Sequence, residues 1–359
     1  MIKKLFFNKF FAIGLFIKLI LIFSISSVAI NDWYMPFIET SINIVNINPW
    51  DLWINSGGSV DAFPYGYAMW ITFLPSFLIA KLTNISLLAS YHLTILVCDF
   101  MLLYILLKLA PGRERLLLFS YWLSPVVILA TYGFGYNDII PVLFLVASIL
   151  CIKKLSFYLA GLFVAAAVSA KLSMIVSVPL VLIYIYNNKS IRNKLIDFII
   201  SFGVTSLLIT IPFILSKSGS MMLFQNPEMT KIYDLALGIG DISIIVIPLL
   251  YFISLYFIFN FKRPNFDLFI SIIGIVFLFI VLMNPASPGW FVWSIPFLAL
   301  YQSKSGREAI ILTYIYSILY LLSSLSLKTI IFTNGYQLNL IILLQDSAIY
   351  SSTTVSLLH

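Results

Sequence analysis

Apolar segments alternate with short polar loops along almost the whole chain. Many of these segments approach the ~20 residues that an α-helix needs to cross a bilayer. The first runs from about residue 7 to residue 30, the second from 87 to 108, the third from 116 to 132, and the last ends near Lys328. We therefore predict an all-α fold, a polytopic membrane helical bundle with about 11 transmembrane helices.

Lysine and arginine gather in alternate loops of this pattern. Short basic loops of membrane proteins face the cytoplasm, so these residues predict the orientation of each helix. The loops expected on the cytoplasmic side hold 15 of the 21 basic residues. They contain Lys3, Lys4, Lys9, Lys108, Arg113, Arg115, Lys153, Lys154, Lys189, Arg192, Lys194, Lys262, Arg263, Lys304 and Arg307.

The apolar segment 67–82 is an exception in this alternation. It carries Pro75 and is flanked by polar turns. A full span here would place every later basic loop on the outer side, so we predict a re-entrant or interfacial segment. It then belongs to a large first external loop, 32–84. A second external loop covers 217–241, and the tail after Lys328 is expected to hold a final short span or an interfacial helix.

Composition excludes a water-soluble globule. Hydrophobic residues make up 61% of the 359 residues, charged residues only 10%, and the mean hydropathy is +1.05. So few charges do not cover the surface of a soluble protein. The pattern holds no linker or soluble segment, so we predict that 1–359 form a single integral membrane domain.

Charge and special residues narrow the chemistry further. The net charge of +7 comes from short loops, so it reports topology and not a nucleic-acid partner. Cys98 and Cys151 lie in apolar runs, and His92 and His359 are the only histidines, which excludes a His-rich metal centre. The chain has no Walker loop, nucleotide fingerprint or nucleophile motif, so ATP and nucleotide-sugar chemistry are not expected.

Two acids are placed at the outer boundary. Asp32 follows the first predicted span, and Asp138 lies at the outward end of the third. Two such carboxylates can serve as a catalytic base and its partner, or can hold a divalent cation. Solvated charges at helix ends are the alternative.

Three further charges fall inside apolar runs, where they are costly unless they are paired or face a polar cavity. Lys171 interrupts the run 165–174, and there it binds a phosphate, pairs with an acid or reaches the interface. Asp99 lies in the middle of the second helix, where we expect a structural pairing with a lysine or a helix end. Lys18 is expected to extend its ammonium toward the cytoplasmic interface.

Proline and glycine break the chain at the outer boundary in 63–66 and 284–290. Irregular backbone at that depth is tolerated where it lines a cavity, and ordinary loop chemistry is the alternative. Tryptophans gather on the same side, where their rings stack on sugars or anchor at lipid headgroups. They are Trp50, Trp53, Trp70, Trp290 and Trp293.

The order of these features resembles the GT-C class of membrane glycosyltransferases. Within that class the chain is most similar to the family of mannosyltransferases that add the first mannose to glycosylphosphatidylinositol precursors, and to their bacterial relatives. The similar stretch covers about residues 30–185, a GT-C-like core with 32–84 as its catalytic loop, and 186–359 are variable helices. The matching residues are Asn31-Asp32-Trp33-Tyr34, Asn48-Pro49-Trp50, Phe63-Pro64-Tyr65, Cys98-Asp99, Leu123-Ser124-Pro125, Tyr136-Asn137-Asp138 and Ala170-Lys171.

The resemblance implies an inverting transfer of a hexose, mannose first, from a polyprenyl-phosphate-linked donor to a glycan or glycolipid acceptor. It implies Asp32 as the catalytic base and Lys171 as the cation beside the leaving phosphate. The other substrate-binding residues implied are Asp138, Asn137, Tyr65 and Trp290. It also implies membrane lipid as the surroundings and a bacterial cytoplasmic membrane with an active site that faces outward.

One departure from the family concerns metal. The family often has two acids spaced by one residue after the first helix, and Ile30 stands in the place of the first. A divalent metal in this loop is therefore doubtful, and we predict no cofactor and an activity with weak or no metal dependence.

Two rival functions remain open. A transporter or flippase for a polar or lipid-linked substrate would use Asp99 and Lys171 as a midplane site. A non-catalytic subunit of a glycan-assembly complex is the other alternative, and the retention of Asp32, Asp138 and Lys171 together argues against it. The acid-bearing loop 32–84 favours the enzyme.

Overall fold

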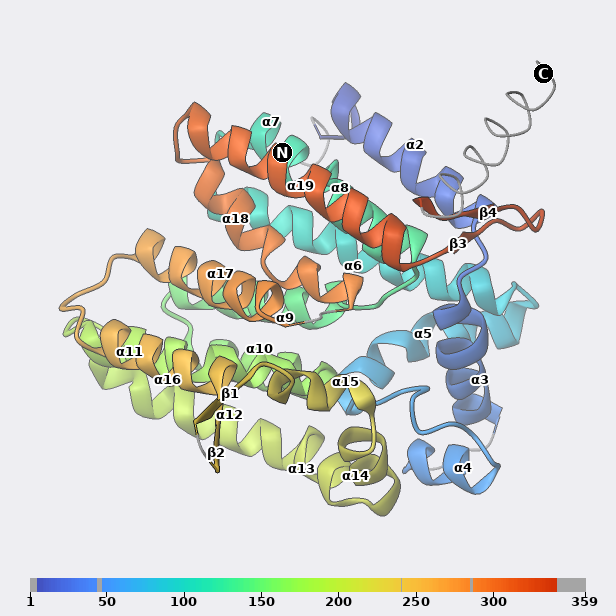
Figure 1. The fold of residues 1–359 in the computed structure, drawn as a ribbon, viewed down its shortest axis with the longest axis horizontal. Coiled ribbons are helices and arrows are strands. Elements are labelled where there is room, and N and C mark those ends of the chain that lie inside the picture. The colour runs from blue at the N-terminus through green and yellow to red at the C-terminus, as the bar shows by residue number, and fades with distance from the viewer. Residues whose placement is uncertain (1–4, 44–46, 240, 285–286, 341–359) are drawn as a thin grey trace, which may run out of the picture.

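The computed structural model describes residues 5–43, 47–239, 241–284 and 287–340, and these form a layered bundle of α-helices (Figure 1). The predicted all-α fold is confirmed. The α-helices are α2 (Lys9–Ser24), α3 (Met35–Asn43), α4 (Pro49–Asn55), α5 (Tyr67–Thr83), α6 (Leu87–Leu109), α7 (Glu114–Leu117), α8 (Pro125–Val127), α9 (Ile139–Lys153), α10 (Phe157–Ala170), α11 (Ser177–Asn187), α12 (Leu195–Ile209), α13 (Ile211–Leu215), α14 (Lys217–Phe224), α15 (Pro227–Thr230), α16 (Val246–Phe259), α17 (Phe266–Leu282), α18 (Ile295–Gln302) and α19 (Arg307–Leu327).

Short turns of other helix types and two small hairpins complete the fold. The π-helical turns are η1 (Ala29–Tyr34), η2 (Leu118–Trp122) and η3 (Ile128–Gly133), and the 3-10 turns are η4 (Leu172–Val176), η5 (Arg192–Lys194), η6 (Lys231–Tyr233) and η7 (Pro288–Trp293). The antiparallel hairpins are β1 (Ala236–Ile239) with β2 (Ile242–Ile245), and β3 (Ile330–Ile331) with β4 (Gln337–Leu338). Helices α14 and α15 and the strand β1 lie in the predicted external loop 217–241, and β2 follows directly after it.

Prolines divide three of the predicted helices. A proline has no backbone N–H to donate and disfavours helical backbone in the residue before it. The predicted helix 116–132 breaks before Pro125, the helix predicted over 195–216 breaks at Thr210 before Pro212, and the helix predicted over 290–304 changes from η7 to α18 beside Pro296. The uninterrupted helices predicted there are therefore wrong in detail, although the segments follow the predicted path.

The first helix is shorter than the predicted 7–30. It ends at Ser24, because the next residues pair with the C-terminal hairpin instead of continuing the helix. The Ser26 amide donates to the Ile331 carbonyl at 2.7 Å, and the Ser27 hydroxyl donates to the Phe134 carbonyl at 2.6 Å. The chain then resumes as η1.

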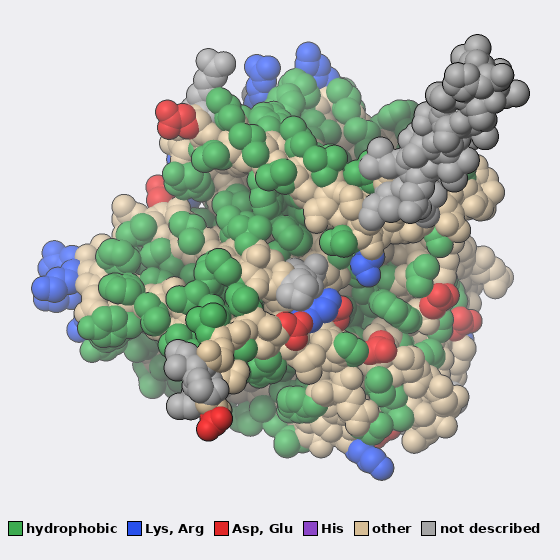
Figure 2. Space-filling model, in the orientation of Figure 1, with side chains coloured by type: hydrophobic (Ala, Val, Ile, Leu, Met, Phe, Trp, Pro, Cys, Tyr) green, Lys and Arg blue, Asp and Glu red, His purple; other side chains and the backbone are tan. Residues whose placement is uncertain are grey.

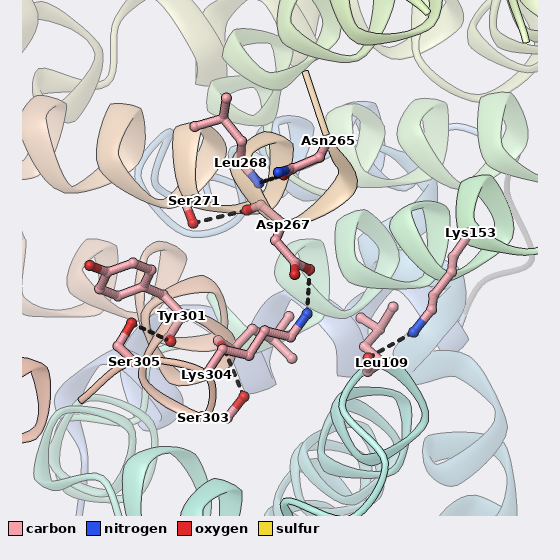
Figure 3. A network of polar contacts seen from close by, with 11 residues as sticks. Leu109, Lys153, Asn265, Asp267, Leu268, Ser271, Tyr301, Ser303, Lys304 and Ser305 are labelled. Atoms are coloured by element: carbon pink, nitrogen blue, oxygen red, sulfur yellow. Dashed lines mark hydrogen bonds and ion pairs between the residues drawn. The ribbon is translucent and has the colours of Figure 1, made fainter. Parts of the chain in front are cut away.

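The predicted basic loops that fall in the described residues lie together at one end of the bundle, here called the basic end; Lys3 and Lys4 lie outside the described residues. The Lys153 ammonium, at the end of α9, donates to the Leu109 carbonyl at the end of α6 over 2.8 Å (Figure 3). It also lies 5.9 Å from the ring of Phe266 at the start of α17. In the same region Lys304 forms an ion pair with Asp267 (Figure 3).

The remaining basic loops reach the same end. The Asn188 amide group, after α11, donates to the Pro264 carbonyl just before α17 over 3.3 Å. On the other side, Phe10 of α2 packs on Phe119, with ring centroids 4.3 Å apart, and Arg115 lies 5.6 Å from the Phe10 ring. The structure therefore brings together the loops that the positive-inside rule places on one side.

Helix α5 stays at the opposite end. The Gly66 amide before it donates to the carbonyl of Ser169 near the end of α10 over 2.8 Å, and further along Ser76 contacts Thr94 of α6. Helix α2 starts at the basic end and runs to the opposite end, and α6 runs from the opposite end back to the basic end. The segment between them, which includes α5, therefore begins and ends at the opposite end. This arrangement agrees with the interfacial or re-entrant placement predicted for 67–82.

Several helices of the described chain are apolar enough to contact lipid. Three helical segments are long enough to cross a membrane, namely 87–109, 114–133 with its break before Pro125, and 308–327, and six further apolar helices have 10–17 residues. Hydrophobic side chains cover much of the face shown in Figure 2. The fold is that of an integral membrane helical bundle.

A buried ion pair ties the first helix to the interior. Lys18 Nζ lies 2.6 Å from Asp99 Oδ2, and both side chains are fully buried. The hydroxyls of Tyr121 and Tyr132 each donate to the Asp99 carboxylate at 2.7 Å, and the ammonium lies 3.2 Å from the centre of the Trp122 ring. The lysine expected beside Asp99 is therefore Lys18. The prediction that Lys18 reaches the interface is wrong, because its charge is satisfied inside.

Candidate functional site

A cavity of about 250 Å³ opens at the end of the bundle opposite the basic end. It is here called the Asp138 cavity. Helix α9 starts directly after Asp138 and ends at Lys153 in the basic end, so Asp138 marks the opposite end. Figure 2 shows acidic and basic side chains next to one another in the middle of a largely hydrophobic face. The charged and aromatic lining residues are Trp33, Tyr34, Asp61, Tyr65, Tyr136, Asp138, Lys171, Glu228, Trp290 and Lys328.

The centre of the cavity wall is an ion pair. Lys171 Nζ lies 2.5 Å from Asp138 Oδ1, and the indole N–H of Trp293 donates to the same oxygen over 2.6 Å. The Asp138 side chain is 2% exposed and that of Lys171 is 13% exposed. Lys171 adopts extended backbone directly after α10, with φ −154° and ψ 118°. This local break in the helix places the lysine side chain beside the start of α9.

Aromatic rings surround the ammonium group. Lys171 Nζ lies 5.3 Å from the ring centre of Trp293, 5.6 Å from that of Tyr65 and 5.9 Å from that of Trp290. The two indoles stack with centroids 5.0 Å apart. Ring faces attract a cation and exclude water from it. An ammonium group has three N–H donors and Asp138 takes one of them, so the cation retains donors for an anionic oxygen in the cavity.

Two tyrosine hydroxyls add hydrogen-bond donors to the same wall. The hydroxyls of Tyr34 and Tyr65 lie 3.4 Å apart. Burial raises the pKa of Tyr65 above its ordinary value, and the negative charge of Asp138 raises it further. Burial also raises the pKa of Tyr34. Both hydroxyls therefore stay protonated and can donate to a ligand oxygen.

Gly289 lets η7 approach the ion pair closely. A Cβ atom at this position would lie 2.4 Å from Asp138 Oδ2 and 2.9 Å from the Tyr136 Cβ. We expect Gly289→Ala to lower the free energy of unfolding in detergent by ~1–3 kcal/mol, because the added methyl group overpacks a tight contact. Gly203→Ala is the matched control, because a Cβ there meets no atom within 4 Å. An equal effect of the two substitutions would contradict the close packing at Gly289.

The structure brings together four of the predicted site residues. Asp138, Lys171, Tyr65 and Trp290 all line the cavity. Asn137 does not line it: this residue is fully buried, and its two side-chain amide atoms have no hydrogen-bond partner among the described residues.

Asp32 and Asp99 lie outside the cavity lining. Asp32 is an exposed residue of η1, although its neighbours Trp33 and Tyr34 do line the cavity. Asp99 lies in the separate pair with Lys18. Asp99 therefore pairs with Lys18, and Lys171 pairs with Asp138, in two separate ion pairs. The transporter alternative requires Asp99 and Lys171 to form one midplane site, and this arrangement does not favour it.

Sequence reasoning missed the contribution of the loop 217–241. Glu228 of α15 lines the cavity and forms an ion pair with Lys231 over 2.6 Å, and the Lys231 ammonium lies 5.9 Å from the Trp290 ring. One buried oxygen each of Glu228 and Asp61 has no hydrogen-bond partner in the part of the chain that is described. The only sequence signal was the presence of acids in external loops, which does not say which of them turn inward.

Comparison with known proteins gives a fold relationship. The sequence matches no protein-family model and no curated protein. Among solved structures it is similar to the crystal structure of ArnT from Cupriavidus metallidurans in the apo state, with 14% identity and a TM-score of 0.51. The chain has a GT-C membrane helical fold. The alignment covers 88% of this chain and 63% of the ArnT chain, so the protein spans less than two thirds of that structure's length.

Proposed function

We propose that this protein is a GT-C glycosyltransferase that takes a sugar from a polyprenyl-phosphate-linked donor. The observation that carries the proposal is the Lys171 ammonium at the wall of the Asp138 cavity, in a chain with the fold of ArnT. A half-buried cation that retains donors and is surrounded by aromatic rings suits a leaving phosphate and a sugar ring. The finer assignment follows the family resemblance: a hexose donor, mannose first, and a glycan or glycolipid acceptor at the outer face of a bacterial cytoplasmic membrane.

The reaction needs three functions from the chain. An acceptor hydroxyl oxygen attacks the anomeric carbon, the bond from that carbon to the phosphate oxygen breaks, and the configuration inverts. The proton of the hydroxyl passes to a carboxylate, and the bonding electrons leave with polyprenyl phosphate. Lys171 stabilises the charge that grows on this phosphate, an effect that strengthens where water is excluded. We assign the binding of sugar hydroxyls to the Tyr65 hydroxyl and Asp138, which both line the cavity.

Two carboxylates are candidates for the base. The resemblance implies Asp32, which follows the first helix, and we propose it as the base. Asp61 is the second candidate, because it lines the cavity and has a buried oxygen without a partner among the described residues.

The first test measures transfer of label from synthetic polyprenyl-phosphate sugars, mannose first, to glycan and glycolipid acceptors in membranes that express each variant. We expect Asp32→Asn to lower turnover by ~10²–10⁴-fold, the usual contribution of a general base. Glu39→Gln is the control, because this exposed acid of α3 does not line the cavity. If Asp61→Asn loses turnover and Asp32→Asn keeps normal turnover, Asp61 is the general base instead of Asp32. No transfer by the wild-type protein from any donor would contradict the proposed function.

We further propose that the activity does not depend on a bound metal. Among the described residues, no three side chains of His, Cys, Asp and Glu lie together as a metal site would require, and the ammonium of Lys171 supplies positive charge at the cavity. Treatment with EDTA should leave at least half of the transfer activity. Complete loss on EDTA, restored by Mg²⁺ or Mn²⁺, would show that a metal takes part.

A further inference from the structure

A second hollow lies far from the Asp138 cavity, at the basic end. It is a groove of about 570 Å³ between α7, η2 and α8 on one side and α18 and α19 on the other, here called the Arg115 groove. Its lining runs from Arg115 in α7 to Ser124 before α8 and across to Ser317 in α19. Nine residues of helix rise roughly 13 Å, which is close to the thickness of about 15 Å that one leaflet contributes to the hydrocarbon core.

The groove has a single charged lining residue. Arg115 is exposed at its mouth, and it forms no ion pair with an acid in the described part of the chain. Its guanidinium group lies over the Phe10 ring instead, at 5.6 Å. No acid lines the groove. This charge pattern suits a ligand with a negative head and no positive group, because nothing in the lining would balance a ligand ammonium.

Polar side chains line the interior of the groove below Arg115. Gln302, Ser124 and Ser317 are 5%, 3% and 4% exposed, and no described residue forms a hydrogen bond with their side chains. Their polar atoms are accessible from the groove, so they can donate hydrogen bonds to oxygen atoms of a ligand that lies in it. The ester oxygens of a diacyl glycerophospholipid lie just below its phosphate. The hydrocarbon of a polyprenyl phosphate offers no acceptor there.

The remaining walls suit acyl chains. Phe119, Leu123 and Ile310 line the groove. Only 17% of the apolar stretch of α19 is buried within the protein. Most of α19 is therefore available to lipid beside the groove.

We propose that the Arg115 groove binds an anionic glycerophospholipid. Arg115 binds the phosphate, Gln302 at the end of α18 binds an ester oxygen below it, and the acyl chains run past the two serines along Phe119 and α19. Anionic lipids attract basic residues near the membrane surface, and the groove adds hydrogen bonds that a general surface attraction lacks.

The test is competition for retained lipid. Full-length protein is reconstituted in nanodiscs with equal amounts of phosphatidylglycerol and phosphatidylcholine, released into mild detergent, and examined by native mass spectrometry. We expect the wild type to retain phosphatidylglycerol in preference. Arg115→Gln should lower the retained amount about fivefold, the ratio for the loss of one basic contact. Arg113→Gln is the matched control, because this arginine has the same charge two residues away and does not line the groove.

Gln302→Leu provides an independent variant. It keeps the side-chain volume and removes an amide without a partner, so the protein should stay folded while phosphatidylglycerol retention falls. Equal retention of the two lipids, or equal retention by wild type and both groove variants, would overturn the proposal. A further arm adds undecaprenyl phosphate, and displacement of phosphatidylglycerol by it at equal concentration would also overturn the choice of lipid. The result does not depend on sugar transfer.

Discussion

Replacing Lys171 by glutamine should lower sugar transfer by ~10²–10³-fold, the scale for losing one charged stabiliser of a developing anion. The ammonium is the cation held by Asp138 and the surrounding rings at the cavity wall. The loss should appear in the turnover number more than in donor binding, because charge on the phosphate is largest in the transition state. The measurement is the rate of label transfer at saturating donor. Lys217→Gln is the control, since this exposed lysine lies in the second external loop.

A second variant separates chemistry from folding. Lys171→Gln leaves the Asp138 carboxylate buried with only the Trp293 indole as a partner, which destabilises the protein. The double variant Lys171→Gln/Asp138→Asn removes the unpaired charge, so it should recover stability and remain inactive. Recovery of transfer together with stability would show that Lys171 acts only as a structural partner.

Lys18→Met should lower the free energy of unfolding by ~3–5 kcal/mol, because it leaves the fully buried Asp99 carboxylate without its cation. The measurement is denaturant unfolding of the purified protein in detergent. Lys9→Met, an exposed lysine on the same helix, is the control and should change the value by less than about 0.5 kcal/mol. The double variant Lys18→Met/Asp99→Leu should recover part of the loss. Equal small losses in both single variants would contradict a buried ion pair.

The helix order was predictable because the apolar pattern and the basic loops report it directly. The starts and ends of α6, α9 and α10 fall close to the polar residues that flank each apolar run. The breaks at Pro125 and Pro212 were not predicted, although proline signals them, because a run of apolar residues continues through each. The end of the first helix at Ser24 depends on a pairing with Ile331, more than 300 residues away, and no local signal encodes it.

The candidate site was predictable in part for a similar reason. Asp138 lies at the end of an apolar run and Lys171 interrupts another. A charged side chain in such a place is costly unless it is paired or faces a polar cavity. Their mutual ion pair was one of the alternatives that the sequence left open, and the structure selects it. Glu228 was not predicted, because an acid in a polar loop carries no cost that would reveal it. Its position depends on how the loop folds over Trp290.

The pairing between the segment before η1 and the strand β3 constrains the order of biosynthesis. The backbone just before η1 is tied to the strand β3, and Lys328 from the same C-terminal segment lines the Asp138 cavity. A domain generally folds as a unit during synthesis, and η1 reaches its final place only after Ile331 has been synthesised. The pocket is therefore completed only after translation has passed Ile331, and a chain terminated after α19 would emerge without a finished site.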